Sequence, residues 1–145
     1  MTEPILLVED DNADALLIQR AIRKAKITNP VHRVDDGDAA VQYLAGAIEG
    51  SSPTPVVVLL DLKLPRRSGF EVLAWLRGNR AAMRRLPVVI LTSSSQDADV
   101  NRAYDLGANS YLVKPGDPDG LLRVLQNVHT YWLELNQPPA VSTPI

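Results

Sequence analysis

The sequence predicts an α/β fold, a doubly wound parallel sheet with helices on both faces, in a single domain. Short apolar runs alternate five times with stretches whose apolar residues recur at helical spacing, and there is no internal repeat. Alternation of this kind favours a parallel sheet covered on both sides. The central run, from Val56 to Leu60, is apolar at every position, which is typical of a strand buried on both faces.

The second of the expected strands is short and flanked by polar residues, which suits the edge of a sheet better than its centre. The first helix is expected to end near Lys26 and to be capped by Asp11 or Asn12. Asp36 and Asp38 are expected to form a turn and a cap before the second helix. The five strands are expected at residues 5–8, 31–34, 56–60, 88–91 and 110–113.

The later helices have equally clear start and stop signals. Ser68 is expected to open the third helix, and Gln96 the fourth, which Gly107 ends in a left-handed turn. The serines from Ser93 to Ser95 are expected to be mostly cap residues. The basic stretch from Arg77 to Arg85 is interpreted as a solvated face.

Composition bounds the class of protein. The chain has 145 residues, of which 46% are hydrophobic and 22% charged, which fits one globular domain over residues 3–136 and a loose tail over residues 137–145. A net charge of -2 argues against a nucleic-acid partner. No signal peptide and no membrane-spanning run is apparent. The absence of cysteine excludes disulfides and thiolate metal sites, and it fits a cytoplasmic protein.

Polar residues stand where the expected strands end. Ligands of such folds bind at the carboxyl ends of strands, where the strand order reverses. Five carboxylates, a hydroxyl pair and a lysine at one edge of a sheet are not expected as parts of a hydrophobic core. The residues at these ends are Glu9, Asp10, Asp11, Asp36, Asp61, Thr92, Ser93 and Lys114.

The acids predict a divalent cation. Asp10 and Asp61, at adjacent strand ends, repel each other unless a cation joins them, by about 1 kcal/mol at 4 Å in water and more in a less polar medium. A few oxygen ligands with room for water and phosphate favour Mg²⁺ over Ca²⁺. Zinc is disfavoured because no histidine or cysteine stands at a strand end.

A metal-held aspartate can act as a nucleophile and form an acyl phosphate. Lys114 and Thr92 would then supply a cation and a hydroxyl to the phosphoryl oxygens. The glycine-rich loops that cradle nucleotide phosphates are absent from the sequence. The phosphoryl donor is therefore expected to be another molecule and not ATP bound to this chain.

These features together resemble the receiver domain of two-component response regulators over roughly residues 3 to 130. The resemblance implies a flavodoxin-like sheet of order 2-1-3-4-5, and a phosphoacceptor that catalyses only its own phosphorylation and dephosphorylation. The donor would be a sensor histidine kinase or a histidine phosphotransfer protein. The matching residues are Glu9-Asp10, Asp61, Pro65, Thr92 and Lys114-Pro115.

The resemblance also implies residue roles. Asp61 is the phosphoacceptor, and it binds Mg²⁺ together with the Asp10 carboxylate and the Lys63 backbone carbonyl, while Glu9 acts through water. Lys114 is the phosphate-binding lysine. Thr92 and Tyr111 form the switching pair, although Tyr111 alone also fits an ordinary half-buried aromatic residue. The peptide bond before Pro115 is expected to be cis.

A narrower likeness is to stand-alone regulators of phytochrome-type sensor kinases, including bacteriophytochromes. Three features carry this likeness: the long loop near Gly50, the stretch Leu91-Thr92-Ser93-Ser94 and the segment Tyr131-Trp132-Leu133. It implies a homodimer formed through the fourth-to-fifth unit face and the last helix, whose apolar band is wider than one core contact needs. The sequence departs from the family at Gly116–Gly120, where an apolar residue usually follows Lys-Pro.

Two other functions are weighed against phosphoacceptance. A phosphorylation-independent module that sequesters a kinase would not need the full set of Asp10, Asp61, Thr92 and Lys114. A haloacid-dehalogenase-like phosphatase needs a second acid two residues after its nucleophile, and position 63 is lysine.

Overall fold

A computed structural model describes residues 3–140. All five strands are parallel and lie in the order β2-β1-β3-β4-β5, which confirms the predicted topology. The short strand expected at an edge, β2, is an edge strand, and β5 is the other. The strands are β1 (Ile5–Val8), β2 (Val31–Val34), β3 (Val57–Leu60), β4 (Val88–Thr92) and β5 (Ser110–Val113).

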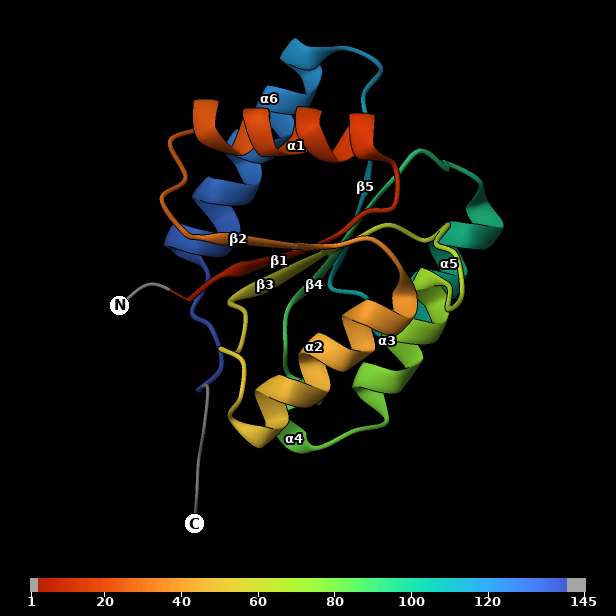
Figure 1. The fold of residues 1–145 in the computed structure, drawn as a ribbon. Coiled ribbons are helices and arrows are strands. Elements are labelled where there is room, and N and C mark those ends of the chain that lie inside the picture. Colours follow the sequence, from red (N-terminus) through yellow and green to blue (C-terminus); the bar gives the residue numbers. More distant parts are fainter. Residues whose placement is uncertain (1–2, 141–145) are drawn as a thin grey trace.

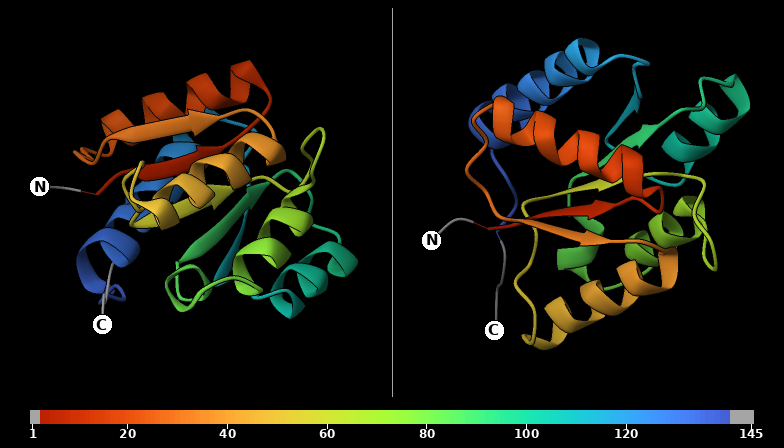
Figure 2. Two further views of the ribbon diagram at one scale, coloured as in Figure 1. Left: turned by 60° about the horizontal axis from the view of Figure 1, so that its bottom comes forward. Right: turned by 45° about the horizontal axis from the view of Figure 1, so that its top comes forward.

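Helices cover both faces of the sheet (Figures 1 and 2). One face carries α1 (Asn12–Lys24) and α6 (Pro118–Val128), which pack against each other. The opposite face carries α2 (Gly37–Glu49), α3 (Gly69–Arg77), the short α4 (Ala81–Arg84) and α5 (Asp97–Asp105). The short α4 lies within the basic stretch and was not predicted.

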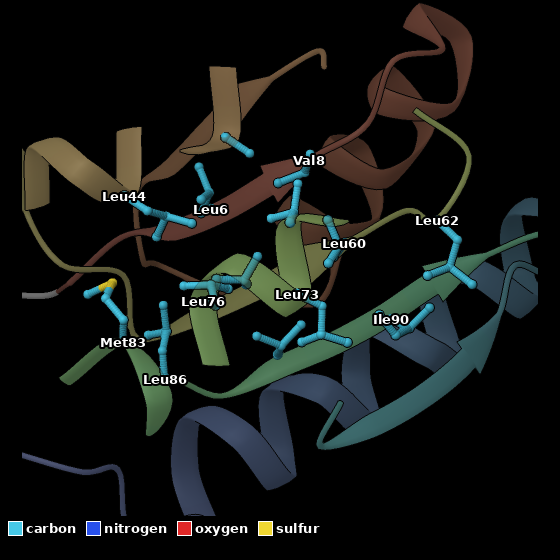
Figure 3. Packing of buried hydrophobic residues seen from close by; sticks show 14 of the residues in the cluster. Leu6, Val8, Leu44, Leu60, Leu62, Leu73, Leu76, Met83, Leu86 and Ile90 are labelled. Carbon is cyan, nitrogen blue, oxygen red and sulfur yellow. The ribbon is translucent and has the colours of Figure 1, made fainter. Parts of the chain in front are cut away.

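Alternate residues of the central strands supply two cores, one on each face of the sheet. Leu6 and Leu60 point into the core under α2 and α3, where Leu73 meets them (Figure 3). Leu7 and Leu59 belong to the core under α1 and α6. Every residue of β1 and β3 is buried, so the packing on each face holds the two strands in one register. The residues that directly follow these strands are therefore held in fixed positions as well.

Helix caps agree with the sequence at most positions. Asp11 caps α1 and Asp36 caps α2, each by accepting a hydrogen bond from a backbone N–H of the first turn. Ser68 forms a reciprocal capping box at the start of α3. The expectation for Ser93 to Ser95 was wrong, because the N-cap of α5 is Gln96, which makes no side-chain cap bond.

The interpretation of Arg77 as part of a solvated face was also wrong. Its guanidinium is half-buried and donates hydrogen bonds to the carbonyl oxygens of Met83, Arg84, Leu86 and Gly107, at 2.8 to 3.2 Å, and to the Asn109 side chain at 2.9 Å. Burial lowers its pKa. The end of α3 is thereby tied to the segments that lead into β4 and β5.

The chain continues from α6 into a π-helical segment, η1 (His129–Leu135), which the sequence did not predict. The apolar stripe of α6 is buried, and beyond it Tyr131 and Leu135 are 51% and 71% exposed. Of the predicted tail, residues 141–145 lie outside the described residues, and Pro138 and Pro139 lie against the amino-terminal end of the sheet.

The expected cis bond before Pro115 was wrong, because no cis peptide bond occurs within residues 3–140. Trans is the intrinsically favoured isomer of an X–Pro bond, by about 0.5–1 kcal/mol. The Lys114 side chain reaches Asp61 from this trans backbone.

No helix within residues 3–140 is both long and apolar enough to cross a lipid bilayer.

Candidate functional site

Asp61 directly follows β3 and is 6% exposed. Its Oδ1 accepts a hydrogen bond of 2.8 Å from the Thr92 hydroxyl, at the end of β4, and a longer one of 3.4 Å from the Lys63 N–H. Its Oδ2 accepts a hydrogen bond of 3.1 Å from the Lys114 ammonium, which follows β5. Three parallel strands thus bring Asp61, Thr92 and Lys114 into contact, as their positions at strand ends predicted.

Glu9, Asp10 and Asp61 form an acidic cluster in which one carboxylate oxygen from each lies within 4.8 Å of the others. Glu9 is buried and Asp10 is exposed, so the cluster opens to solvent on the Asp10 side. Burial raises the pKa of Glu9 to about 7, and the charge of Asp61 adds to this rise. Hard carboxylate oxygens so close together suit a divalent cation that prefers oxygen ligands.

Lys114 balances the charge of this cluster. Its Nζ lies 2.5 Å from Glu9 Oε1, 3.0 Å from Asp14 Oδ2 and 3.1 Å from Asp61 Oδ2. Burial alone would lower the pKa of Lys114, but the hydrogen bonds to Glu9 and Asp14 and the charge of Asp61 raise it above its ordinary value. These carboxylates therefore favour the ammonium form of Lys114.

Two residues of this site were missed by sequence reasoning. Asp14, in the first turn of α1, contacts Lys114 across 100 positions of sequence. Arg33, on β2, donates hydrogen bonds of 2.8 and 3.0 Å to the Glu9 carbonyl and one of 3.3 Å to the Asp10 carbonyl. A basic residue within a short edge strand was the available signal for Arg33, and an acid one turn beyond Asp10 was the signal for Asp14.

Gly69 allows the turn after Asp61 to pack against the start of α3. A Cβ at this position would lie 2.2 Å from the Asp61 carbonyl oxygen and 2.7 Å from the Leu62 Cα. Only glycine fits so close an approach of two backbones.

Tyr111 lies on β5, and its hydroxyl donates a hydrogen bond of 2.9 Å to the Ser94 carbonyl. Burial raises the pKa of Tyr111. The Ser94 hydroxyl in turn donates a hydrogen bond of 2.6 Å to Asp99 on α5 and accepts one from the Gln96 N–H. The loop that follows Thr92 is therefore held by Tyr111 on one side and by α5 on the other.

The fold and this edge of the sheet define a class of protein. Residues 5–126 match the response regulator receiver domain family, and the chain belongs to that family. This confirms the predicted fold and the predicted resemblance.

Individual relatives are similar over nearly their whole length. The probable methanogenesis regulatory protein FilR2 of Methanothrix harundinacea is 43% identical over 93% of this chain and 86% of its own. The response regulator Rcp1 of Synechocystis is 40% identical over 94% of this chain and 92% of its own.

Two solved structures extend the likeness, and one of them is a phytochrome response regulator. The Mn²⁺-bound form of Rcp1 superimposes with a TM-score of 0.85 at 38% identity, covering 95% of this chain and 99% of that one. The phosphorylated cyanobacterial phytochrome response regulator RcpA superimposes with a TM-score of 0.88 at 33% identity, covering 97% of this chain and all of its own, 100%. The narrower likeness to phytochrome regulators is thereby confirmed as a likeness.

Proposed function

We propose that this chain accepts a phosphoryl group on Asp61 and changes its protein-interaction surface in response. The observation that carries the proposal is the pair of contacts on the Asp61 carboxylate, from Thr92 at 2.8 Å and from Lys114 at 3.1 Å, beside the acids Glu9 and Asp10. A buried strand-end carboxylate that already has a hydroxyl and an ammonium in place is prepared for the charge that develops during phosphoryl transfer.

In the proposed reaction a carboxylate oxygen of Asp61 attacks the phosphorus atom of a phosphohistidine. The new P–O bond forms as the P–N bond breaks, and the imidazole nitrogen leaves with the electron pair and takes up a proton. Lys114 neutralises one phosphoryl oxygen and the Thr92 hydroxyl donates to another. Attack of water on phosphorus later returns the free carboxylate and inorganic phosphate, so the chain acts only on its own phosphoryl group.

The metal we assign to the acidic cluster is Mg²⁺. The carboxylates of Asp10 and Asp61 would hold it, with the backbone carbonyl of Lys63 as a further ligand and Glu9 acting through a water molecule. A bound Mg²⁺ supplies positive charge to the phosphoryl oxygens. The existence of an Mn²⁺-bound form of the relative Rcp1 supports the assignment of a divalent cation.

Thr92 and Tyr111 are the residues we assign to the switch. In the resting molecule Thr92 donates to Asp61, and Tyr111 holds the carbonyl of Ser94, two residues further along the same loop. A phosphoryl group on Asp61 offers Thr92 a new acceptor. Movement of Thr92 toward it would pull the loop and alter the hydrogen bond that Tyr111 makes.

The phosphoryl donor we propose is a sensor histidine kinase of the phytochrome type, with a histidine phosphotransfer protein as the other possible donor. The likeness to RcpA, a phytochrome response regulator that has been crystallised in its phosphorylated form, supports this choice.

We further propose a homodimer formed through the face where the fourth and fifth strand–helix units adjoin, at α5 and β5, and through the carboxy-terminal helix. Apolar side chains on this side of the molecule are exposed, including Tyr104 and Val113 at 49% and 42%. A groove of about 460 Å³ runs between β5 and the last helices and is lined by Leu112, Val128 and Trp132 among others. An edge strand beside an apolar groove is a favourable surface for a second copy.

Incubation with acetyl phosphate and Mg²⁺, followed by intact-mass measurement, tests phosphoacceptance. One phosphoryl group is expected on the wild type and on Asp105→Asn, an exposed-acid control, and none on Asp61→Asn. Failure of the wild type to gain phosphoryl mass would refute the proposal. A kinase affinity that ignores both Mg²⁺ and phosphoryl analogues would instead favour the phosphorylation-independent binding module.

Sedimentation velocity at micromolar concentration tests the dimer. Trp132→Ala is expected to shift the population to monomer, whereas the conservative Trp132→Phe should retain the dimer. A Trp132→Ala variant that remains fully dimeric would count against the proposed interface.

A further inference from the structure

Lys114 has three N–H donors, and three carboxylates lie within 3.1 Å of them, those of Glu9, Asp14 and Asp61. A phosphoryl oxygen arriving at Asp61 needs one of these donors. Because phosphorylation turns the Asp61 carboxylate into an acyl phosphate, the phosphoryl oxygen must share the ammonium with the two remaining carboxylates, those of Glu9 and Asp14.

Burial decides which contact is released. Of the two carboxylates that remain after phosphorylation, the side chain of Glu9 is 1% exposed, whereas that of Asp14 is 42% exposed. Loss of the ammonium would leave a buried carboxylate without a partner, which is costly. Asp14 escapes this cost because water can take the place of the lysine.

The surroundings of Asp14 leave room for that exchange. A cavity of about 210 Å³ opens between α1 and the loop that joins β5 to α6, and Asp14, Ser93 and Lys114 are among its lining residues. Water can enter at this point without displacing the core.

The charge of Asp14 acts in the same direction. Lys114 Nζ lies 3.0 Å from Asp14 and 3.1 Å from Asp61, so the two carboxylate oxygens are at most about 6 Å apart. The phosphoryl group carries further negative charge toward Asp14. The resting contact with Asp14 holds Lys114 on the α1 side.

We propose that Asp14 is a positioning residue that competes with the phosphoryl group for Lys114 and thereby limits the affinity of the site for phosphoryl ligands. This inference rests on the proposed function and adds to it a residue that tunes the stability of the phosphorylated state. It gives α1 a carboxylate that is paired at rest and free after phosphoryl transfer.

The test is a titration of the protein with beryllofluoride, an acyl-phosphate analogue, at saturating Mg²⁺, followed by ¹⁹F NMR. Asp14→Asn is expected to bind the analogue about three- to tenfold more tightly than the wild type, from the Coulomb energy of one charge at this separation. Asp14→Ala, which removes the acceptor as well as the charge, should tighten binding at least as much. Asp105→Asn, the exposed-acid control, should leave the affinity unchanged.

The sign of the effect separates competition from a merely structural role. A residue that only stabilises the fold would weaken both thermal stability and analogue binding when it is replaced, whereas a competitor tightens analogue binding even if the resting protein melts earlier. Unchanged or weaker binding by Asp14→Asn would overturn the inference. A wild type that does not bind the analogue at all would refute the proposed function itself.

Discussion

Replacement of Arg77 by methionine should destabilise the protein without touching the acidic cluster. Methionine retains an apolar stem of similar length but has no donor. The guanidinium joins the end of α3 to the carbonyls of Met83 and Leu86, before β4, and to that of Gly107, before β5. β4 and β5 position Thr92 and Lys114 beside Asp61 at their carboxyl ends. Arg77 therefore stabilises the same two strands at their amino-terminal ends.

The expected cost follows from the acceptors left behind. Arg84 O is exposed and can turn to water, whereas the carbonyls of Met83, Leu86 and Gly107 are partly buried. Each buried acceptor left unpaired costs about 1–3 kcal/mol. The lower value applies because Arg77 itself is half-buried, which gives about 3 kcal/mol in the free energy of unfolding. For a chain of this size that corresponds to a fall in Tm of roughly 6–12 °C.

Urea unfolding followed by tryptophan fluorescence, with calorimetry for the Tm, measures this change. Arg80→Met is the matched control, because Arg80 is exposed and no side-chain hydrogen bond of its guanidinium is seen within the described residues. It should stay within about 0.5 kcal/mol of the wild type. Equal stability of Arg77→Met and Arg80→Met would refute the claim that the hydrogen bonds from Arg77 to these carbonyl groups stabilise the fold.

Three further results are expected. Gly69→Ala should cost about 1–3 kcal/mol, because its Cβ would lie 2.2 Å from a backbone oxygen, whereas Gly116→Ala, with no atom within 4 Å, should be neutral in the same unfolding assay. Tyr111→Phe should lose about 1 kcal/mol of stability, since it removes the hydrogen bond to Ser94, and full retention of stability would show that the bond is replaced by water. The pKa of Glu9, raised from 4.5 to about 7, means that the folded state holds this proton more tightly than the unfolded chain. Stability of the metal-free protein should therefore decline as pH rises from about 4.5 through 7, by up to about 3 kcal/mol, and Glu9→Gln should abolish that decline.

Local patterns in the sequence determined that the sheet is parallel with helices on both faces, and at which edge the chemistry lies, whereas the strand order was implied by the resemblance to receiver domains. Apolar runs and helical spacing depend on neighbouring residues alone, and a parallel sheet necessarily gathers the residues that follow its strands. Asp61, Thr92 and Lys114 were predicted together for this reason, and in the structure the Asp61 carboxylate lies 2.8 Å from the Thr92 hydroxyl and 3.1 Å from the Lys114 ammonium.

Only the tertiary structure decided which further polar side chains contact the site around Asp61 and which are partly buried elsewhere. Three such contacts join residues that are 24 or more positions apart in the sequence. They are Asp14 with Lys114, Arg33 with the Glu9 carbonyl, and Arg77 with the Gly107 carbonyl. Such contacts depend on the reach and rotamer of a flexible side chain in a packed environment, and periodicity carries no information about either. The trans bond at Pro115 and the π-helical continuation of α6 have the same origin, because packing chooses between backbone states that differ little in local energy.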